Sequence, residues 1–433
     1  MSDNSIGYLL YVLPLVAILF FYLRRQKKKE HHHVVQLKEA LAAGLTEPAS
    51  LHPVFDFNRC IGSGACVTAC PEEAIGLIKG KGHLIKPAVC IGHGACRDAC
   101  PHDAISLVFG TAKRGVDIPR VNPDFETNIA GIYIAGELGG MGLIRKAVEQ
   151  GRQAIESIHK KKKGNAPFDV VIIGAGPAGL AASLAALEKK LRFVTLEQED
   201  SLGGTVYHYP RNKMVMTKSM NLPLIGKVRI NEISKEALLE FWLGVVKKIN
   251  LKINFSERME TITKTADGFV VKSSRNTYQT KTILLSIGRR GTPRKLDVPG
   301  EDLPNVVYRL IDPEQYRNQR VLVVGGGDSA LEAALAIADQ PGTAVTLSYR
   351  GDAFGRVKEK NRQRLQETEK KGRLKVLLQS NVKKIERDKI VLDCTGKTIE
   401  IKNDSVIISA GGVLPTPLLK EIGVMVETKY GTA

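Results

Sequence analysis

A glycine-rich loop between an apolar strand and a helix constrains the fold of this chain more than any other feature. Residues 168–179 read FDVVIIGAGPAG, where an apolar strand runs into the spacing G-x-G-x-x-G, and LAASLAALEKK continues as a helix. In such a loop the first glycine permits a tight turn, the second lets the backbone approach a pyrophosphate, and the third lets helix and strand pack. The helix N-terminus attracts the phosphates. The predicted contacts are Gly174, Gly176, Pro177, Ala178 and Gly179.

The next strand supplies the acid that a dinucleotide-binding unit needs. RFVTLE ends at Glu197, 18 residues beyond Gly179, where a carboxylate can hold the ribose hydroxyls. A Gly-Gly-Thr turn at Gly203, Gly204 and Thr205 is a further predicted contact. Strand, loop, helix and acid together predict a Rossmann-like unit that binds a dinucleotide.

A second unit of the same kind begins at residue 320. RVLVVGGGDSA has the spacing G-x-G-x-x-A, and its predicted contacts are Gly325, Gly327, Asp328, Ser329 and Ala330. The following strand, AVTLSYR, ends at Arg350 instead of an acid, and Arg356 and Lys358 come soon after it. Positive charge accommodates the 2'-phosphate that distinguishes NADPH from NADH. We therefore expect NADPH here; the alternative is that Arg350 only ends a surface loop.

Six of the seven cysteines fall in two runs that repeat after 30 residues. Cys60 to Pro71 read CIGSGACVTACP, Cys90 to Pro101 read CIGHGACRDACP, and a short apolar segment follows each run. In a reducing compartment such an array indicates a metal site instead of disulfides. Zinc is less well matched, because zinc sites usually show paired C-x2-C motifs.

The repeat resembles the bacterial two-cluster ferredoxin, whose run is C-x2-C-x2-C-x3-C-P. In that family the last cysteine of each run binds the other cluster. The resemblance therefore implies Cys60, Cys66 and Cys100 for one site and Cys90, Cys96 and Cys70 for the other.

Each run departs from the ferredoxin pattern at one position. Ser63 and His93 stand where the second cysteine would be. Three outcomes stay open: a [3Fe-4S] cluster, a [4Fe-4S] cluster completed by the oxygen of Ser63 or the nitrogen of His93, and a [4Fe-4S] cluster with one iron open to solvent or substrate. His93 is the better candidate, because neutral imidazole binds iron more readily than a serine hydroxyl.

Residues 168–433 resemble the thioredoxin-reductase-like class of pyridine nucleotide-disulfide oxidoreductases. Besides both glycine loops, two segments have the form of the chain that crosses between the two domains of that class. They are TILLSIGRRGTP (282–293), which contains Gly288, and SVIISAGGVLPTP (405–417). The resemblance implies FAD at the first loop, with Gly288 among its contacts, and a nicotinamide nucleotide at the second. The redox dithiol of that class is missing ahead of the second loop, and Cys394 is expected to be a small core residue.

The phrase that closes the flavin domain in this class stands out of order. It resembles T-x-x-P-G-I-Y-A-A-G-D and is expected after residue 433, but residues 126–158 read ETNIAGIYIAGELGGMGLIRKAVEQGRQAIESI. The resemblance implies that Gly136 and Glu137 replace the Gly-Asp pair that contacts the flavin ribityl chain. We therefore predict a circularly permuted flavin domain, since domain termini tend to lie close together. We also expect a homodimer. A tail exchanged between its two subunits would fit the same sequence.

An uncharged stretch of 18 residues, Ile6 to Leu23, precedes all of these motifs. As a helix it would reach about 27 Å, near the hydrocarbon thickness of a bilayer. The basic run 24–29 follows it instead of preceding it, which favours a permanent anchor over a cleaved signal peptide. We expect a single-pass protein of the bacterial inner (cytoplasmic) membrane, with the globular part in the cytoplasm.

The formal charge of +18 also raises the question of nucleic acid. Much of the excess lies in the runs 24–29 and 160–163, without the interleaved aromatic residues that stack on bases. No nucleic-acid partner is expected.

The predicted fold class is α/β, with two Rossmann-like dinucleotide-binding domains for FAD and NAD(P), a small α+β two-cluster ferredoxin domain and an N-terminal transmembrane helix. The expected organisation is a transmembrane anchor (6–23), a juxtamembrane linker (24–51), a ferredoxin-like domain (52–110), a permuted segment of the FAD domain (111–160), the FAD domain (168–296), the NAD(P) domain (297–408) and a return to the FAD domain (409–433).

These parts predict an FAD-dependent NAD(P)H oxidoreductase with two iron-sulfur clusters. Nicotinamide transfers a hydride, a cluster carries one electron, and flavin does both. We expect electrons to pass from NADPH through FAD to the clusters and on to an unidentified redox protein, although the reverse direction is thermodynamically possible. Two alternatives stay open: a flavin-dependent reductase of a small disulfide or other organic substrate, and a membrane-tethered redox sensor that does not turn over.

Overall fold

The computed structural model describes residues 3–42, 44–48, 51–112, 114–140, 142–161, 165–211, 213–217, 219–289, 291–354, 357 and 359–431, with the side chains of 3–12, 216, 292 and 359 left out. The chain divides into two units. One comprises Met1–Arg114, Ala353–Lys358 and Gly431–Ala433, and the other Gly115–Asp352 and Glu359–Tyr430.

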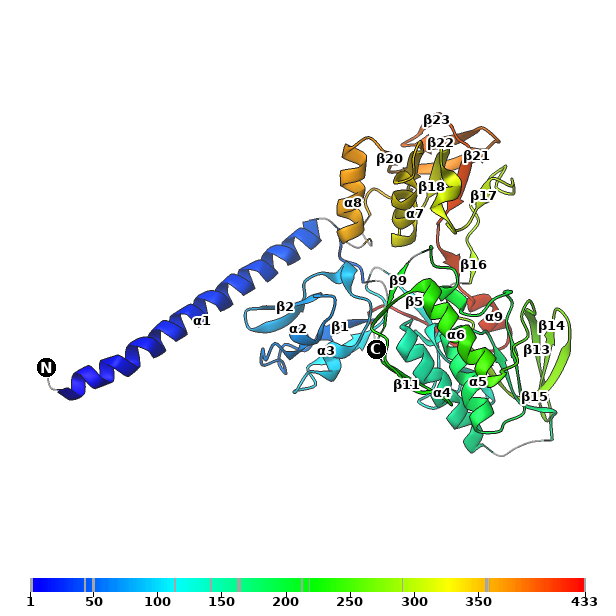
Figure 1. Ribbon diagram of the computed structural model, residues 1–433, viewed down its shortest axis with the longest axis horizontal. Helices are drawn as coiled ribbons and strands as arrows, with labels where there is room; N and C mark the ends of the chain where they lie inside the picture. Colours follow the sequence, from blue (N-terminus) through cyan, green and yellow to red (C-terminus); the bar gives the residue numbers. More distant parts are fainter. Residues whose placement is uncertain are drawn as a thin grey trace. The chain divides into compact units, whose positions relative to one another are not determined.

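Helix α1 (Asp3–Ala42) joins the predicted anchor and most of the predicted linker in one element (Figure 1). Between Leu15 and Ala42 the sequence has no glycine or proline to end the helix. Its later part docks on the cysteine-repeat domain (residues 51–112), because the backbone N–H of Leu77 donates to Nδ1 of His33 at 3.1 Å. The predicted linker is therefore helical as far as Ala42 and attached to its neighbour.

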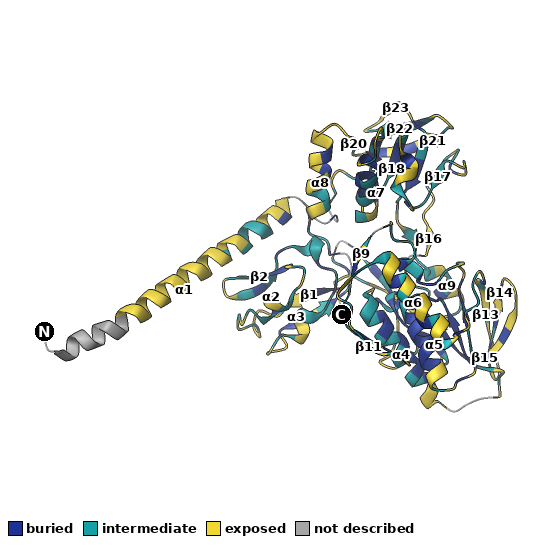
Figure 2. Cartoon of the chain, in the orientation of Figure 1, coloured by how far each residue is buried: buried dark blue, intermediate teal, exposed yellow. Residues whose placement is uncertain are grey.

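The predicted transmembrane helix (6–23) finds no support in the part of the chain that the structure describes, where no helix is both long enough and apolar enough to cross a membrane. The side chains of residues 6–12 of that span lie outside the described part. From residue 13 onward its large apolar side chains are exposed (Figure 2): Leu13, Leu15, Val16, Ile18, Leu19, Phe20, Phe21, Tyr22 and Leu23.

The two cysteine runs fold as two similar halves. Each half has a cysteine loop, a short helix and a strand: α2 (Ala65–Ala69) with β2 (Ile75–Ile78), and α3 (Ala95–Asp98) with β4 (Ile105–Val108). β1 (His52–Phe55) pairs with β4, and β2 with β3 (Lys81–Leu84), both antiparallel; η1 (Pro87–Val89) precedes the second loop. Ile75 and Ile105, which are 30 residues apart, lie in one small core with Cys66 and Cys96. The sequence repeat is thus a structural repeat.

The first glycine loop joins a buried strand to a buried helix. β7 (Phe168–Ile173) lies between β8 (Phe193–Leu196) and β15 (Thr277–Leu285) and is parallel to both, and α5 (Pro177–Glu188) follows the loop. β14 (Gly268–Ser273) and β13 (Met259–Thr265) extend the sheet with antiparallel pairing. The same domain contains α6 (Lys235–Ile249), the hairpin β10 (Met220–Leu222) and β11 (Gly226–Val228), and the pair β9 (Met214–Met216) and β12 (Glu232–Ser234).

The segment before this domain completes its sheet. β6 (Ile132–Ile134) pairs in parallel with the end of β15, with Ile132 opposite Ile283. Helix α4 (Ile144–Lys160) packs on α5, where a Cβ added at Gly151 would lie 2.1 Å from the carbonyl oxygen of Ala178. Residues on both sides of the linker 161–167 therefore share one core.

Strand β5 (Val116–Pro119) pairs antiparallel with β26 (Val426–Lys429), so that Val116 lies opposite Lys429. The hydroxyl of Thr428 donates to the carboxylate of Asp117 at 2.7 Å. Helix α9 (Thr416–Glu421) precedes β26. Two segments about 300 residues apart in sequence are thus neighbours in one small sheet.

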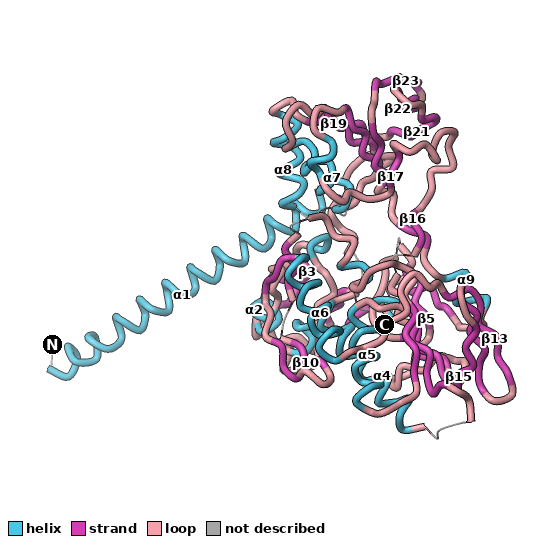
Figure 3. The backbone as a smooth tube through the Cα atoms, turned by 45° about the vertical axis from the view of Figure 1, so that its right-hand side comes forward, coloured by secondary structure: helices cyan, strands magenta, loops and turns pink. Residues whose placement is uncertain are grey.

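The second glycine loop belongs to a parallel sheet whose order is β17-β24-β18-β19-β20. Figure 3 draws its strands in magenta and labels β17 and β19. Its strands are β17 (Val306–Val307), β24 (Ser405–Ile408), β18 (Arg320–Val324), β19 (Ala344–Ser348) and β20 (Leu374–Leu377), with helices α7 (Asp328–Ala338) and α8 (Glu359–Lys370) and the 3-10 turn η4 (Pro313–Tyr316). A three-stranded antiparallel sheet follows: β21 (Ser380–Ile385), β22 (Lys389–Cys394) and β23 (Lys397–Lys402). The short strands β16 (Thr292–Pro293) and β25 (Gly412–Val413) pair where the two crossing segments meet.

Candidate functional site

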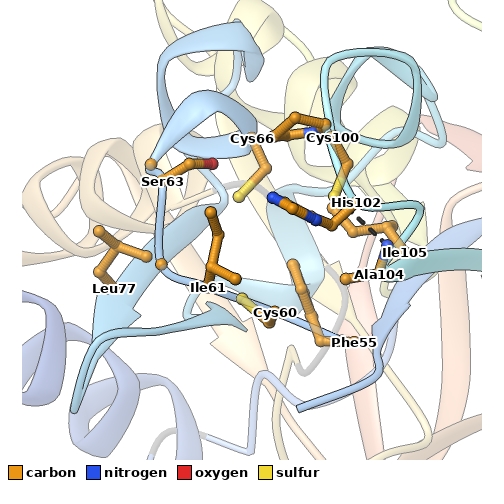
Figure 4. Close-up of a pocket in the computed structure, with 13 residues that line it drawn as sticks. Phe55, Cys60, Ile61, Ser63, Cys66, Leu77, Cys100, His102, Ala104 and Ile105 are labelled. Atoms are coloured by element: carbon orange, nitrogen blue, oxygen red, sulfur yellow. Dashed lines mark hydrogen bonds between the residues drawn. The ribbon is translucent and has the colours of Figure 1, made fainter. Parts of the chain in front are cut away.

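Three cysteines from both runs line one hollow, which we call site one. Cys60 and Cys66 come from the first loop and Cys100 from the second, around a space of about 330 Å³ that is partly open to solvent (Figure 4). Ser63 and His102 line the same hollow. In Figure 4 the Ser63 hydroxyl and the His102 ring are both directed toward the sulfur of Cys66.

The other three cysteines line a second hollow of about 360 Å³, which we call site two. Cys90 and Cys96 come from the second loop and Cys70 from the first. Two further side chains that carry metal-ligand atoms, those of His93 and Glu72, line the same hollow. The structure therefore brings together the same two sets of three cysteines that the ferredoxin resemblance implies.

Burial raises the pKa of three of these thiols, those of Cys66, Cys90 and Cys96. Cys60 and Cys100 raise the pKa of Cys66 further, because neighbouring thiolates would repel. Burial, followed by the charges of Cys90 and Cys70, raises the pKa of Cys96 to about 11. Thiolates so placed are stabilised by a cationic iron centre, and metal binding then releases the protons.

Backbone amides donate hydrogen bonds to three of the cysteine sulfurs. Ala74 N donates to Sγ of Cys70 and Ala104 N to Sγ of Cys100, each at 3.4 Å. Gly82 N donates to Sγ of Cys60, also at 3.4 Å. Such hydrogen bonds to cluster sulfurs tune the potential of an iron-sulfur centre.

The donor sets fit iron-sulfur clusters. In each site three sulfurs surround a hollow, and within the described residues no three metal-ligating side chains converge closely enough to hold a single metal ion. Gly62 shows how tightly the loop is wound: its φ is +74°, and a Cβ there would lie 2.1 Å from the Gly80 oxygen.

The first glycine loop leaves room for a phosphate. A Cβ at Gly179 would lie 1.8 Å from the Gly174 oxygen, so this glycine is required by packing. At Gly176, by contrast, the nearest described atom to an added Cβ is 3.8 Å away. Pro177 and Ala178 begin α5, whose N-terminus faces this open space. The Gly203–Gly204–Thr205 turn lies against the same loop, since a Cβ at Gly204 would come within 3.1 Å of Gly176.

Glu197 is already engaged by the loop. One carboxylate oxygen accepts from Ala175 N at 2.6 Å and the other from Glu199 N at 3.0 Å. Its pKa is raised by burial, which these hydrogen bonds oppose. A carboxylate has about four acceptor positions, so the geometry fixes Glu197 against the loop and leaves capacity for ribose hydroxyls.

The predicted tail residues lie beside the first loop. Gly136 has φ +86°, and a Cβ there would lie 2.9 Å from the Cβ of Ala178. Glu137 is near Gly288, where an added Cβ would lie 3.9 Å from its carboxylate oxygen. The structure thus brings Gly136, Glu137 and Gly288 together from two distant parts of the sequence.

A residue that sequence reasoning missed lies between them. The guanidinium of Arg289 donates to the carbonyl oxygen of Asp117 at 3.0 Å. Burial lowers its pKa, while Glu137 and Asp117 oppose that effect. The signal available in the sequence was an arginine directly after Gly288, and a partly buried cation at this place favours a bound anion.

The second glycine loop is open in the same way. Gly325 has φ +147° and a Cβ there would lie 2.4 Å from the Ser409 oxygen, whereas around Gly327 no described atom lies within 4 Å. Asp328, Ser329 and Ala330 form the first turn of α7. The Tyr349 ring packs against Gly326, and Arg350 next to it is exposed at the end of β19. Arg356 lies outside the described residues.

Comparison with known proteins matches these parts to two families. Residues 171–432 match the pyridine nucleotide-disulphide oxidoreductases, and residues 52–101 match a 4Fe-4S dicluster domain. Both predicted resemblances are confirmed. The families support FAD, NADP and iron-sulfur chemistry, while the number and type of clusters stay predictions.

Among similar proteins are a bacilliredoxin reductase of Bacillus subtilis and a ferredoxin–NADP reductase of Ignicoccus hospitalis. The first is 29% identical over 60% of this chain and 82% of its own length, and the second 34% identical over 43% of this chain and 57% of its own length. The chain thus spans little more than half of the second relative.

Among solved structures, the bacillithiol disulfide reductase of Staphylococcus aureus matches with a TM-score of 0.53 and 26% identity, over 60% of this chain and 81% of that one. The corresponding enzyme of Bacillus cereus, with a TM-score of 0.55 and 24% identity over 60% and 82%, shows the fold alone. The chain is therefore an FAD-dependent NAD(P)H oxidoreductase that belongs to the pyridine nucleotide-disulphide oxidoreductase family and carries a 4Fe-4S dicluster domain.

Proposed function

We propose that the chain takes electrons from NADPH and passes them singly to a redox protein. The observation that carries the proposal is the pair of hollows with three thiols each, in a chain whose two glycine loops leave room for two dinucleotides. FAD exchanges two electrons with nicotinamide and single electrons with iron-sulfur clusters.

The chain's own residues bind and orient in this proposal. Gly176 and the start of α5 receive the pyrophosphate of FAD, and Glu197 is held against the loop for the ribose. Arg289 supplies a partly buried positive charge beside Gly288, which stabilises negative charge on a ligand there. Cys60, Cys66 and Cys100, and likewise Cys70, Cys90 and Cys96, hold iron.

Anaerobic mixing with NADPH tests this proposal. The wild-type protein should bleach its flavin and then reduce a one-electron acceptor such as cytochrome c. The double variant Cys66→Ala, Cys96→Ala should still bleach its flavin but should lose the cluster EPR signals. Its rate of reduction of the one-electron acceptor should fall at least about tenfold. Cys394→Ala, which changes the one cysteine outside the two runs, in β22, is the matched control. Wild-type acceptor rates in the double variant would refute the proposal.

A second candidate is reduction of a small disulfide. Similarity to a bacilliredoxin reductase favours it, although the sequence between the two glycine loops has no cysteine. Turnover with low-molecular-weight disulfides, undiminished in the double cysteine variant, would select this candidate over the first.

We infer that the flavin domain is circularly permuted. Supporting observations are the parallel pairing of β6 with β15 and the antiparallel pairing of β5 with β26, in which the end of one strand faces the start of the other. A short turn from Lys429 to Val116 would restore the usual family order. A gene that encodes 168–430, a glycine-containing turn and 116–161 should therefore yield a flavoprotein. Residues 115–431 in native order are the control. If the control binds FAD but the rearranged chain is insoluble or free of flavin, the inference is contradicted.

We also propose that the chain associates with the cytoplasmic face of a bacterial membrane. Support comes from the exposed apolar side chains between residues 13 and 23 and from the basic run 24–29 behind them. The full chain should remain in a salt-washed membrane fraction, and a variant that starts at Arg24 should not. Recovery of the full chain in the soluble fraction would overturn this. The homodimer stays a prediction.

A further inference from the structure

The two cysteine loops differ in what replaces the missing fourth thiolate. Site two has His93 at that position, and site one has Ser63. Site one nevertheless contains an imidazole, because His102 lines it from the other half of the repeat. Thus each hollow is lined by three thiols and one histidine.

The turn after Cys100 explains how His102 reaches site one. Ala104 N donates to Sγ of Cys100 at 3.4 Å, so residues 100–104 wrap around that sulfur. Asp103 supports the tight turn with φ +46°. Cys100 itself crosses from the second run to site one, and His102, two residues later, lines the same hollow. The Cys-Pro turn therefore delivers a thiol and an imidazole together.

The first run has the same turn with a different side chain. Ala74 N donates to Sγ of Cys70 at 3.4 Å, and Glu73 has φ +50°. Glu72, the counterpart of His102 after 30 residues, lines site two and lies close enough to Cys90 to raise the pKa of its thiol. The repeat geometry thus brings the residue after Cys-Pro to each site, and only in site one is that residue a histidine.

We propose that His102, and not Ser63, is the non-cysteine ligand of the iron-sulfur cluster in site one. A neutral imidazole nitrogen donates to iron without losing a proton, whereas a serine hydroxyl must become an alkoxide first. Both side chains are exposed at the rim of the hollow, so access does not favour the serine. The inference rests on the proposed function in one respect, namely that the cysteine repeat holds clusters.

Labelling with [15N]histidine tests the proposal directly. Pulsed EPR of the reduced, labelled wild-type protein should show strongly coupled histidine nitrogen. His102→Gln should remove a coupling from site one and lower the iron content by about one per chain, while Ser63→Ala should change neither. His83→Gln is the matched control: this ring stacks on Phe57 at 4.9 Å and is not among the described residues that line either hollow.

A thiolate at the same place separates ligation from folding. His102→Cys should keep the iron content of the wild type, lose the nitrogen coupling and lower the potential of site one, because thiolate adds negative charge. Iron-loaded wild-type protein without histidine coupling at site one, or a site-one coupling that survives in His102→Gln, overturns the inference. Wild-type protein that binds no iron and acid-labile sulfide overturns the proposed function as well, so the two failures are distinguishable.

Discussion

The close approach of α4 to α5 can be tested at one glycine. Gly151→Ala adds a Cβ that would lie 2.1 Å from the oxygen and 2.9 Å from the carbon of Ala178, where ordinary contacts begin at 3.4 Å. Both partners are backbone atoms, so no side chain can turn aside. The helices must therefore separate by roughly 1 Å in a close-packed core, which costs about 1–3 kcal/mol.

The cost falls on the flavin site, because Ala178 stands in the first turn of α5 beside the open space at Gly176. A strain of about 1–3 kcal/mol relieved by release of the cofactor lowers FAD affinity roughly 5- to 150-fold. FAD per protein after gel filtration and the thermal unfolding midpoint measure the two effects.

A second helical glycine provides the control. Gly244 in α6 is exposed, and no described atom lies within 4 Å of a Cβ placed there. Gly244→Ala should therefore keep its flavin and gain up to about 1 kcal/mol of stability from helix propensity. If Gly151→Ala matches the wild type in flavin content and unfolding temperature, α4 does not pack on the glycine loop and the account of residues 126–158 is wrong.

Three further changes probe the cofactor sites. Lys81→Met should lower the potential of the site-one cluster by on the order of tens of millivolts, because the Lys81 ammonium lies 2.6 Å from the Cys60 carbonyl oxygen and a cation favours the reduced cluster. EPR-monitored redox titration measures this potential, and Lys81→Arg should keep the wild-type value. Arg350→Glu should raise the KM for NADPH about tenfold and affect that for NADH less; equal changes would show that Arg350 does not contact the 2'-phosphate. The cluster-free protein should lose stability as the pH rises from 9 to about 11, because the folded state keeps the Cys96 proton that the unfolded state releases, and Cys96→Ala should flatten that part of a denaturant-unfolding series.

Local motifs were the part of the fold that the sequence could predict. The strand, loop and helix around Gly174 and Gly325 lie within about 20 residues, and their glycines are required by contacts that recur wherever a backbone approaches phosphate. The segment GIYIAG was recognisable for the same reason, as three strand residues and a turn. Each of these was predicted because its function needs only short-range geometry.

Contacts between distant segments could not be predicted in that way. Arg289 is defined as a site residue by a hydrogen bond to Asp117, 172 residues earlier. His102 lies in site one only because its turn folds over the other half of the repeat. The contact of His33 with Leu77 likewise joins residues 44 positions apart, and no helix signal in residues 24–42 reveals it.

The pairing of β5 with β26 shows what the structure adds to the proposal of a circular permutation. Four residues at 116–119 and four at 426–429 carry no pattern that relates them, because register in a short strand pair is set by tertiary context. Once they are paired, Lys429 faces Val116 as two strands face across a hairpin turn. An opened hairpin is a surface position where new chain ends cost little packing, since the ladder hydrogen bonds survive the cut. The same opening gives a place to attach another domain in sequence before Val116, and there the cysteine repeat stands.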